Sequence, residues 1–390
     1  SNNSFMTIIS KEGMNEFPLL DPEEGVPLFY PFIPPEATAE VLDTLNSRWI
    51  GQGPKVDKFE KNFSNTLNSQ NCFVATGSGT DALHLAYLLA GIKPGDEVIT
   101  PVFTCTATNL PILYEGAIPV FVDIDPNTLN INCDDIEHRI TEKTKAIVAV
   151  DYGGIPAKYD ELVNLCKKYN LYLIADCAQS IGSKYKNYSA CEYADFTAYS
   201  FQAIKTITTS DGGMLSIKNP NLYEKAKRLR WFGIDRSSKQ KGTWENDIKE
   251  LGFKYQMTDL AASLGLAALN HLPKLIDIRR DLLKTYIKNI HHEDIVVLQK
   301  EEESDYYVCP WLCTILVKKN RFGLMEKLRK YSVESAQVHY RNDRYSIFGE
   351  RKKDLPNMDL IEDSYLVLPL HHKITVNDCL KICKIINEGW

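Results

Sequence analysis

The middle of this 390-residue chain alternates short apolar runs with longer stretches of helical periodicity. The apolar runs lie at residues 73–75, 97–100, 119–122, 146–150, 172–175, 196–201 and 214–217. Strands that alternate with helices pair as a mainly parallel sheet that carries helices on its faces. The alternation therefore predicts a large α/β domain. Because no crossover helix precedes residues 214–217, we expect this last strand to be antiparallel.

Beyond about residue 275 the pattern predicts a second, smaller α/β domain. Its strands are expected at residues 295–298, 311–317 and 333–339, with a helix at 321–331. We divide the chain into an N-terminal extension at 1–30, a large domain at 31–275 and a small domain at 276–390. Residues 1–3 are left out of the fold prediction, because a short leading segment can be a remnant of cloning.

Lys205 follows the apolar run 196–201 closely. A lysine just past a buried strand is poorly hydrated, which favours its neutral amine, and a neutral amine attacks aldehydes. Ser200 and the threonines around Lys205 offer hydroxyls for a phosphate, and Gly212-Gly213 lets the backbone approach a ligand. The segment predicts a lysine that holds pyridoxal phosphate (PLP) as a Schiff base. The alternative is an ordinary solvated loop lysine.

Asp176 ends the apolar run 172–175. Ligands of open α/β sheets lie outside the carboxyl ends of the strands. A carboxylate at such an end can pair with the pyridine nitrogen of PLP and keep it protonated, which makes the ring an electron sink. Gln179, three residues on, could donate a hydrogen bond to the 3-oxygen of the ring. The alternative for Asp176 is a plain cap of the next helix.

A third segment, Gly77-Ser78-Gly79-Thr80, separates the run 73–75 from a helical pattern. Free backbone amides and the positive end of the helix dipole bind phosphate at such a position. A helix capped by Ser78 or Thr80 is the common alternative. A phosphate cradle, a carboxylate for the pyridine and a buried lysine, in this chain order, are more specific together than any one of them alone.

These three segments, at residues 77–83, 176–179 and 200–205, resemble the DegT/DnrJ/EryC1/StrS family of sugar aminotransferases. Further blocks at 49–56, 94–101, 257–262 and 368–371 are similar to other parts of its pattern, so the resemblance covers nearly the whole chain. It implies the fold of type I PLP enzymes, which is similar to that of aspartate aminotransferase. That fold has a large, mainly parallel sheet domain and a smaller C-terminal α/β domain.

The resemblance also assigns roles to individual residues. It implies that Lys205 forms the Schiff base and serves as the acid and base of the 1,3-proton shift. Asp176 would pair with the pyridine nitrogen, and Gln179 would lie beside the 3-oxygen. The phosphate would be held by Ser200, Gly79 and Thr80.

The chain departs from the family pattern at three positions. Cys105 stands where relatives commonly have an aromatic residue stacked on the pyridine ring, and Phe103 is a candidate substitute. Gln256 stands where many relatives have an asparagine that reaches the phosphate from the neighbouring subunit. Asp151 stands where a histidine is frequent. We expect Cys105 and Gln256 to contact the cofactor, and we expect the departures to affect cofactor affinity and substrate class.

The resemblance implies an aminotransferase that moves an amino group from L-glutamate to a nucleotide-linked 3-keto or 4-keto sugar. Pyridoxamine phosphate would be its intermediate form, and a homodimer with shared active sites its active unit. The product would serve surface polysaccharide, glycan or natural-product sugar biosynthesis. Two enzymatic alternatives are an aminotransferase for a cyclitol or another non-nucleotide ketone, and a PLP-dependent sugar dehydratase. The dehydratase branch carries a histidine in place of the lysine, so Lys205 disfavours it. The third alternative is a non-catalytic sensor or scaffold, which the intact Lys205, Asp176 and Gln179 disfavour.

The net charge of −6 and the pI of about 5.8 disfavour nucleic acid as a partner. A nucleotide-linked substrate is also anionic, so local groups must bind its diphosphate. The candidates are Arg236, His339, Tyr340 and Arg341, each of which could instead be a surface residue. The ten cysteines are scattered without zinc spacing, so we expect no metal site. With no recognisable signal peptide and no long apolar stretch, we expect a cytoplasmic protein without membrane contact.

Overall fold

The apolar runs of the large domain form one sheet. The computed structural model describes residues 17–300 and 302–390, so the prediction for residues 1–3 lies outside the described residues. Within them the sheet has seven strands, in the order β1-β9-β8-β6-β5-β2-β4. These are β1 (Cys72–Thr76), β2 (Glu97–Pro101), β4 (Ile118–Val122), β5 (Thr144–Val150), β6 (Tyr172–Asp176), β8 (Phe196–Ser200) and β9 (Gly213–Ile217). From β8 to β4 all pairs are parallel, whereas β9 is antiparallel to β8 and β1, as the sequence predicted.

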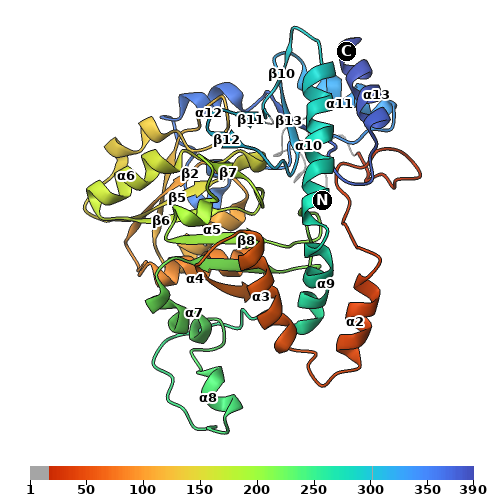
Figure 1. Cartoon of the computed structure of the whole chain (residues 1–390). Helices are drawn as coiled ribbons and strands as arrows, with labels where there is room; N and C mark the ends of the chain where they lie inside the picture. Colours follow the sequence, from red (N-terminus) through yellow and green to blue (C-terminus); the bar gives the residue numbers. More distant parts are fainter. Residues whose placement is uncertain (1–16, 301) are drawn as a thin grey trace, which may run out of the picture.

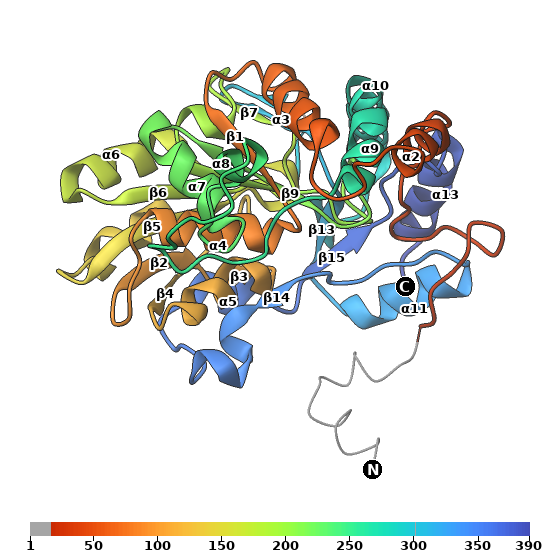
Figure 2. The ribbon, with the colours of Figure 1, turned by 90° about the horizontal axis from the view of Figure 1, so that it is seen from below.

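Helices cover both faces of this sheet, because alternate residues of each buried strand point to opposite faces. In β5, Ile147 and Ala149 belong to one core and Val148 to the other. The first core is covered by α3 (Pro54–Thr66), α6 (Tyr159–Tyr169) and α9 (Asp259–Leu269). The second is covered by α4 (Gly79–Leu89), α5 (Thr106–Tyr114) and α7 (Tyr223–Leu229). Figure 2 shows α3 on one side of the strands and α5 on the other.

The small domain is built on a three-stranded antiparallel sheet in the order β10-β13-β15. Its elements are β10 (Ile295–Val297), β13 (Cys313–Val317), α11 (Arg321–Lys330), α12 (Pro356–Ile361), β15 (Tyr365–Leu368) and α13 (Val376–Asn387). The predicted strand at 333–339 is wrong. That segment makes only isolated bridges, from Val333 to Val26 and from Ala336 to Val367, and the third strand is β15 instead.

A long helix, α10 (Leu272–Asn289), connects the two domains (Figure 1). Leu272 and Leu275 belong to the core of the large domain, whereas Leu283 and Tyr286 belong to the core of the small domain. A boundary near residue 275 therefore falls inside one continuous helix. None of the described helices is both long and apolar enough to cross a membrane.

Several short elements complete the described chain. These are α2 (Ala37–Leu45), which packs on α9, the five-residue helix α8 (Arg236–Gln240), the pair β3 (Phe103–Thr104) and β14 (Tyr340–Arg341), and the small sheet of β7 (Lys184–Tyr185), β12 (Tyr306–Tyr307) and β11 (Glu302–Glu303). The β3–β14 pair ties the C-terminal part of the chain to the large domain directly before Cys105.

The carboxyl ends of β1, β6 and β8 meet at one edge of the sheet. In the strand register, Ser200 lies opposite Gly213, and Gly213 lies opposite Thr76. Asp176 lies opposite Ala198, two residues before Ser200. The strand register thus brings together the three segments that the sequence singled out, although they are far apart along the chain.

Asp259, at the start of α9, fixes the chain that leads into α3. Its carboxylate accepts hydrogen bonds from the backbone amides of Gly53 at 2.8 Å, Lys55 at 3.1 Å and Val56 at 3.0 Å. These amides have no partner within their own helix, since they belong to its first turn. Asp259 is 1% exposed, so a negative charge is buried at the positive end of the α3 dipole.

We predict that Asp259→Ala lowers the free energy of unfolding by about 3 kcal/mol, because three amides, two of them buried, lose a charged acceptor. Asp259→Asn should cost roughly half as much, since one oxygen and the shape remain. Denaturant titration followed by circular dichroism measures both. Asp43→Ala is the matched control, because the Asp43 side chain, which pairs with Lys55, is 75% exposed. This substitution should cost less than ~1 kcal/mol. Equal losses in Asp259→Ala and Asp43→Ala would contradict this account.

Candidate active site

The amino end of α4 forms a narrow cradle at the edge of the sheet. Ser78 caps the helix, and its Oγ accepts a hydrogen bond from the amide of Asp81 at 3.0 Å. A Cβ at Gly79 would lie 2.9 Å from Cβ of Ser200, and one at Gly213 would lie 2.3 Å from the carbonyl oxygen of Ser78. Only glycine fits at both positions. The first amides of α4, those of Gly79 and Thr80 among them, and the hydroxyl of Ser200 therefore lie together, as an anion site requires.

Asp176 is buried at the end of β6 and is held from two sides. Thr108 of α5 donates its hydroxyl to Oδ2 at 2.7 Å, and the amide of Ala178 donates to Oδ1 at 3.1 Å. Burial raises the pKa of the Asp176 carboxyl, while Thr108, Ala178 and the charge of Lys205 lower it. Its orientation is thus fixed by the protein's own hydrogen bonds, and a cationic partner would offset the cost of its burial.

Gln179 lies in the loop after β6 and is also buried. Its Oε1 accepts a hydrogen bond from the amide of Gly153 at 2.8 Å. Gly153 needs its glycine, since its φ of +60° places it in the left-handed region. Because the oxygen end of the amide is used, the NH2 end of Gln179 is the donor that remains to face a ligand.

Asp151 forms hydrogen bonds with the same loop. It accepts hydrogen bonds from the amide of Ala157 at 2.9 Å, from the hydroxyl of Ser180 at 2.9 Å and from the hydroxyl of Tyr159. The thiol of Cys177 also donates to it at 3.4 Å. Burial raises the pKa of the Asp151 carboxyl to about 6, against these hydrogen bonds. Its carboxylate therefore holds the loop that carries Gln179.

Lys205 lies in the turn after β8 with its amine enclosed by other side chains. Burial lowers the pKa of the Lys205 amine to about 8, although Cys105 and Asp176 act to raise it. Its Nζ lies 3.7 Å from the ring centroid of Trp311. At this pKa a substantial neutral fraction exists near physiological pH, which is what a nucleophilic lysine requires.

His339 and Cys105 lie beside Lys205. Burial and the charge of Lys205 lower the pKa of His339 to about 3, so its ring is neutral. Among the described residues, its buried Nε2 has no hydrogen-bond partner. Cys105 precedes α5, where it acts electrostatically on Lys205. Phe103 points elsewhere, into a core with Tyr152 at 5.2 Å and Tyr365 at 4.8 Å between ring centroids, so it does not replace the missing aromatic residue.

Gln256 lies next to the phosphate cradle of its own chain. Its backbone forms a bridge with Thr76, and the neighbouring carbonyl of Tyr255 accepts a hydrogen bond from Gly77 at 2.8 Å. Its Oε1 is buried and has no partner within the described residues. A polar atom left this way costs stability unless a ligand or a second chain satisfies it.

Arg236 is not brought to Lys205 within one chain. It lines a separate cavity of about 510 Å³, together with Trp49, Gln52, Arg230 and Trp231. Burial lowers the pKa of the Arg236 guanidinium, which donates to the carbonyl oxygen of Gln52. In the described structure, Oε1 of Gln52 and Nε of Arg230 are buried without partners.

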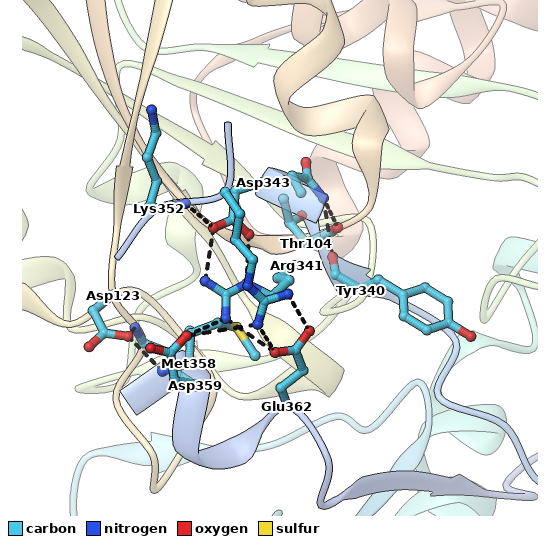
Figure 3. A network of polar contacts seen from close by, with 12 residues as sticks. Thr104, Asp123, Tyr340, Arg341, Asp343, Lys352, Met358, Asp359 and Glu362 are labelled. Carbon is cyan, nitrogen blue, oxygen red and sulfur yellow. Dashed lines mark hydrogen bonds and ion pairs between the residues drawn. The ribbon is translucent and has the colours of Figure 1, made fainter. Parts of the chain in front are cut away.

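Tyr340 and Arg341 are neighbours in β14 but lie in different surroundings (Figure 3). The ring of Tyr340 points away from the network around Arg341 and lies under the guanidinium of Arg344 at 4.3 Å. Arg341 is 1% exposed. It binds Asp343 through two hydrogen bonds of 2.6 and 2.8 Å, Asp359 at 2.6 Å and Glu362 at 3.3 Å.

The guanidinium of Arg341 is thus saturated by carboxylates, which raise its pKa against the effect of burial. This geometry does not fit the diphosphate ligand that the sequence suggested, because no donor of Arg341 faces an open site. Instead Arg341 joins β14 to α12 and thereby supports the position of His339 and Tyr340.

Comparison with known sequences relates this geometry to other proteins. The sequence pattern of the DegT/DnrJ/EryC1/StrS aminotransferase family matches residues 32–387. The chain belongs to this family. It is 37% identical over 383 residues to an uncharacterized protein of Methanocaldococcus jannaschii, with 94% of this chain and 99% of that protein covered. It is 33% identical over 368 residues to the GDP-perosamine synthase of Escherichia coli O157:H7, with 94% and 98% covered.

Solved structures agree with this membership of the aminotransferase family. A Streptococcus pneumoniae protein, described as a candidate sugar aminotransferase, superimposes in its pyridoxamine phosphate form with a TM-score of 0.88. The two are 30% identical, over 93% of this chain and 98% of the other. The PLP form of the same protein superimposes with a TM-score of 0.87. These findings confirm the predicted family, fold class, aminotransferase activity and PLP cofactor.

The site of this aminotransferase fits PLP. The glycines at 79 and 213 let the start of α4 pack closely on β8 and β9, which gathers the first amides of α4 and the hydroxyl of Ser200 into one anion site, and the buried Nε2 of His339 has no partner among the described residues. The residues placed to hold the cofactor are Lys205, Asp176, Gln179, Ser200, Gly79 and Thr80.

Sequence reasoning missed two residues of the site. Trp311 was taken as the first residue of a strand, whereas β13 begins at Cys313 and Trp311 lies against Lys205. Thr108, which orients Asp176, gave no signal beyond being a small polar residue. Trp311 is 106 residues from Lys205 along the chain, and Thr108 is 68 residues from Asp176. No local pattern in the sequence reveals contacts over such separations.

We predict that Arg341→Met destabilises the fold by ~3–5 kcal/mol, because it leaves the buried carboxylate of Asp343 unpaired. Thermal and denaturant unfolding measure this. Arg344→Met is the matched control, since the guanidinium of Arg344 lies over the tyrosine rings of its own segment and has no carboxylate partner among the described residues. It should cost less than ~1 kcal/mol. If Arg341→Met instead weakened substrate binding at unchanged stability, the structural role assigned to Arg341 would be wrong.

Proposed function

We propose that this aminotransferase moves an amino group from L-glutamate to a 3-keto or 4-keto sugar carried by a nucleotide, in the cytoplasm. The product would serve the synthesis of surface polysaccharide, glycans or natural-product sugars. One observation carries the proposal: an enclosed lysine amine with a pKa of about 8 lies beside a buried carboxylate and a cradle for phosphate. The relative named GDP-perosamine synthase supports a sugar linked to a nucleotide.

When bound, PLP supplies a carbonyl carbon that takes up and releases amino groups and a ring that delocalises electrons. Lys205 would accept a proton from the amino donor and return it on the other side of the exchange. Its pKa of about 8 suits both roles near neutral pH, because efficient acid and base groups have a pKa close to the working pH. The face of Trp311 keeps the amine in reach of this site.

Asp176 would hold a proton on the pyridine nitrogen. Its two oxygens already accept one hydrogen bond each, which prevents the carboxylate from turning away. Gln179 would donate from its NH2 end to the 3-oxygen, since its Oε1 is fixed by Gly153. Neutral His339 adds no positive charge beside Lys205, which keeps the neutral amine accessible.

The cavity around Arg236 would take the nucleotide. Trp49 and Trp231 offer aromatic faces for a base, while Arg236 offers positive charge for phosphate groups. The overall charge of −6 repels an anionic substrate, so such local groups are needed. Because this cavity is separate from Lys205 within one chain, the proposal requires a second chain to bring the two together.

The test is an assay with PLP, L-glutamate and a panel of nucleotide-linked 3-keto and 4-keto sugars. We expect an amino sugar by mass spectrometry and NMR, with one 2-oxoglutarate for each product, and no product with Lys205→Ala. A free nucleoside diphosphate should compete. Ammonia release without 2-oxoglutarate would indicate a dehydratase. Turnover of a cyclitol that no nucleotide inhibits would indicate a non-nucleotide ketone.

We further propose that the active unit is a homodimer in which Gln256 completes the phosphate site of the partner. The support is the buried Oε1 of Gln256, which finds no partner within the described chain. The backbone of Gln256 also lies beside the cradle of its own chain, through the bridge to Thr76, so the two arrangements must be separated by experiment.

Mixing the variants Lys205→Ala and Gln256→Ala, the second of which we expect to bind PLP more weakly, separates the two arrangements. A dimer of one Lys205→Ala chain and one Gln256→Ala chain contains, if sites are shared, one site with both changes and one site with neither. We therefore expect part of the activity to return on mixing. If Gln256 serves its own chain, every site keeps one change and nothing returns. A monomer by light scattering would also contradict the proposal.

A further inference from the structure

The amine of Lys205 lies on the face of an indole. Its Nζ is 3.7 Å from the ring centroid of Trp311, which is only 1% exposed. A cation at this distance from an aromatic face is attracted by the negative face of the ring, and tryptophan is the strongest of the aromatic side chains in this respect. The interaction grows when the pair is shielded from water, and here Trp311 is buried while Lys205 is half-buried.

The indole is fixed in place from two directions. Its Nε1–H donates to the carbonyl oxygen of Ile204 at 2.8 Å, which ties the ring to the residue directly before Lys205. Phe29 stacks on Trp311 with ring centroids 5.1 Å apart and an angle of 13° between the planes. His339 lies against it as well, at 5.9 Å and 26°. The ring therefore offers the lysine a rigid surface.

The other groups that act on Lys205 are Cys105, which precedes α5, Asp176 at the end of β6, and His339 before β14. His339 is neutral, so it makes no ion pair with the amine of Lys205. Burial lowers the pKa of Lys205, and an ammonium ion stabilised by the indole would oppose that effect.

We propose that Trp311 is a positioning residue whose indole face receives the free amine of Lys205 and favours its protonated form. A free lysine occurs in every cycle, whenever the cofactor carries the amino group. The indole then keeps the amine close to where it must act and limits how far burial shifts its protonation. This inference rests on the proposed role of Lys205 but is tested without turnover.

The experiment uses the cofactor-free protein. Trace acetic anhydride acetylates only neutral amines, so the extent of Lys205 acetylation, measured by peptide mass spectrometry across a pH range that brackets 8, gives the midpoint of its titration. In Trp311→Leu we expect the midpoint to fall by about one unit, because the π face is lost while the apolar surroundings remain. In Trp311→Phe we expect a smaller shift in the same direction.

Phe29→Leu is the matched control, since it removes an aromatic ring that stacks on Trp311 rather than on Lys205. Its midpoint should stay at the wild-type value. A midpoint that is unchanged or raised in the Trp311 variants, or one that falls as much in Phe29→Leu, would overturn the proposal. If Trp311→Leu fails to fold, Trp311→Phe carries the same test. The sugar assay is independent, so a failure of the proposed function would be seen there alone.

Discussion

Taking the amine of Lys205 out of water is the constraint on which the rest of the site depends. Water stabilises an ammonium ion strongly, so an enclosed lysine loses its proton more easily, and here its pKa falls to about 8. Every neighbour tunes this effect. Asp176 supplies negative charge, His339 stays neutral, and Trp311 supplies a polarisable face.

Charged side chains play different roles in the buried network around Arg341 and in the cavity around Arg236. The carboxylates around Arg341 neutralise it inside the protein, where it joins β14 to α12 and so positions His339. Asp259 likewise neutralises a helix end, that of α3. Arg236, by contrast, lines an open cavity beside buried polar atoms that have no partner among the described residues. The role of an arginine therefore cannot be inferred from the sequence until the carboxylates around it are known.

Much of the fold and site followed from local pattern. Alternating apolar runs predicted the mainly parallel sheet and the antiparallel β9, because buried strands must be apolar along their length and crossover helices need chain length. Asp176 and Ser200 were found because ligands lie at carboxyl strand ends.

The strand predicted at 333–339 was wrong, since this segment includes polar residues and pairs only at Val333 and Ala336. Cys105 does lie at Lys205, whereas Phe103 turned into the core because strand residues alternate.

The sequence by itself determined the family, the sheet, the lysine and its carboxylate, since each is encoded in a contiguous segment whose local conformation depends mainly on its own residues. Only the tertiary structure decided what lies against them. Trp311 contacts Lys205 although 106 residues separate them along the chain, and Thr108 contacts Asp176 although 68 residues separate them. The guanidinium of Arg341 is paired with the carboxylates of Asp359 and Glu362. Such contacts arise from the packing of separate elements around α10 and the β3–β14 pair. A short window of sequence therefore does not predict which side chains that packing brings together.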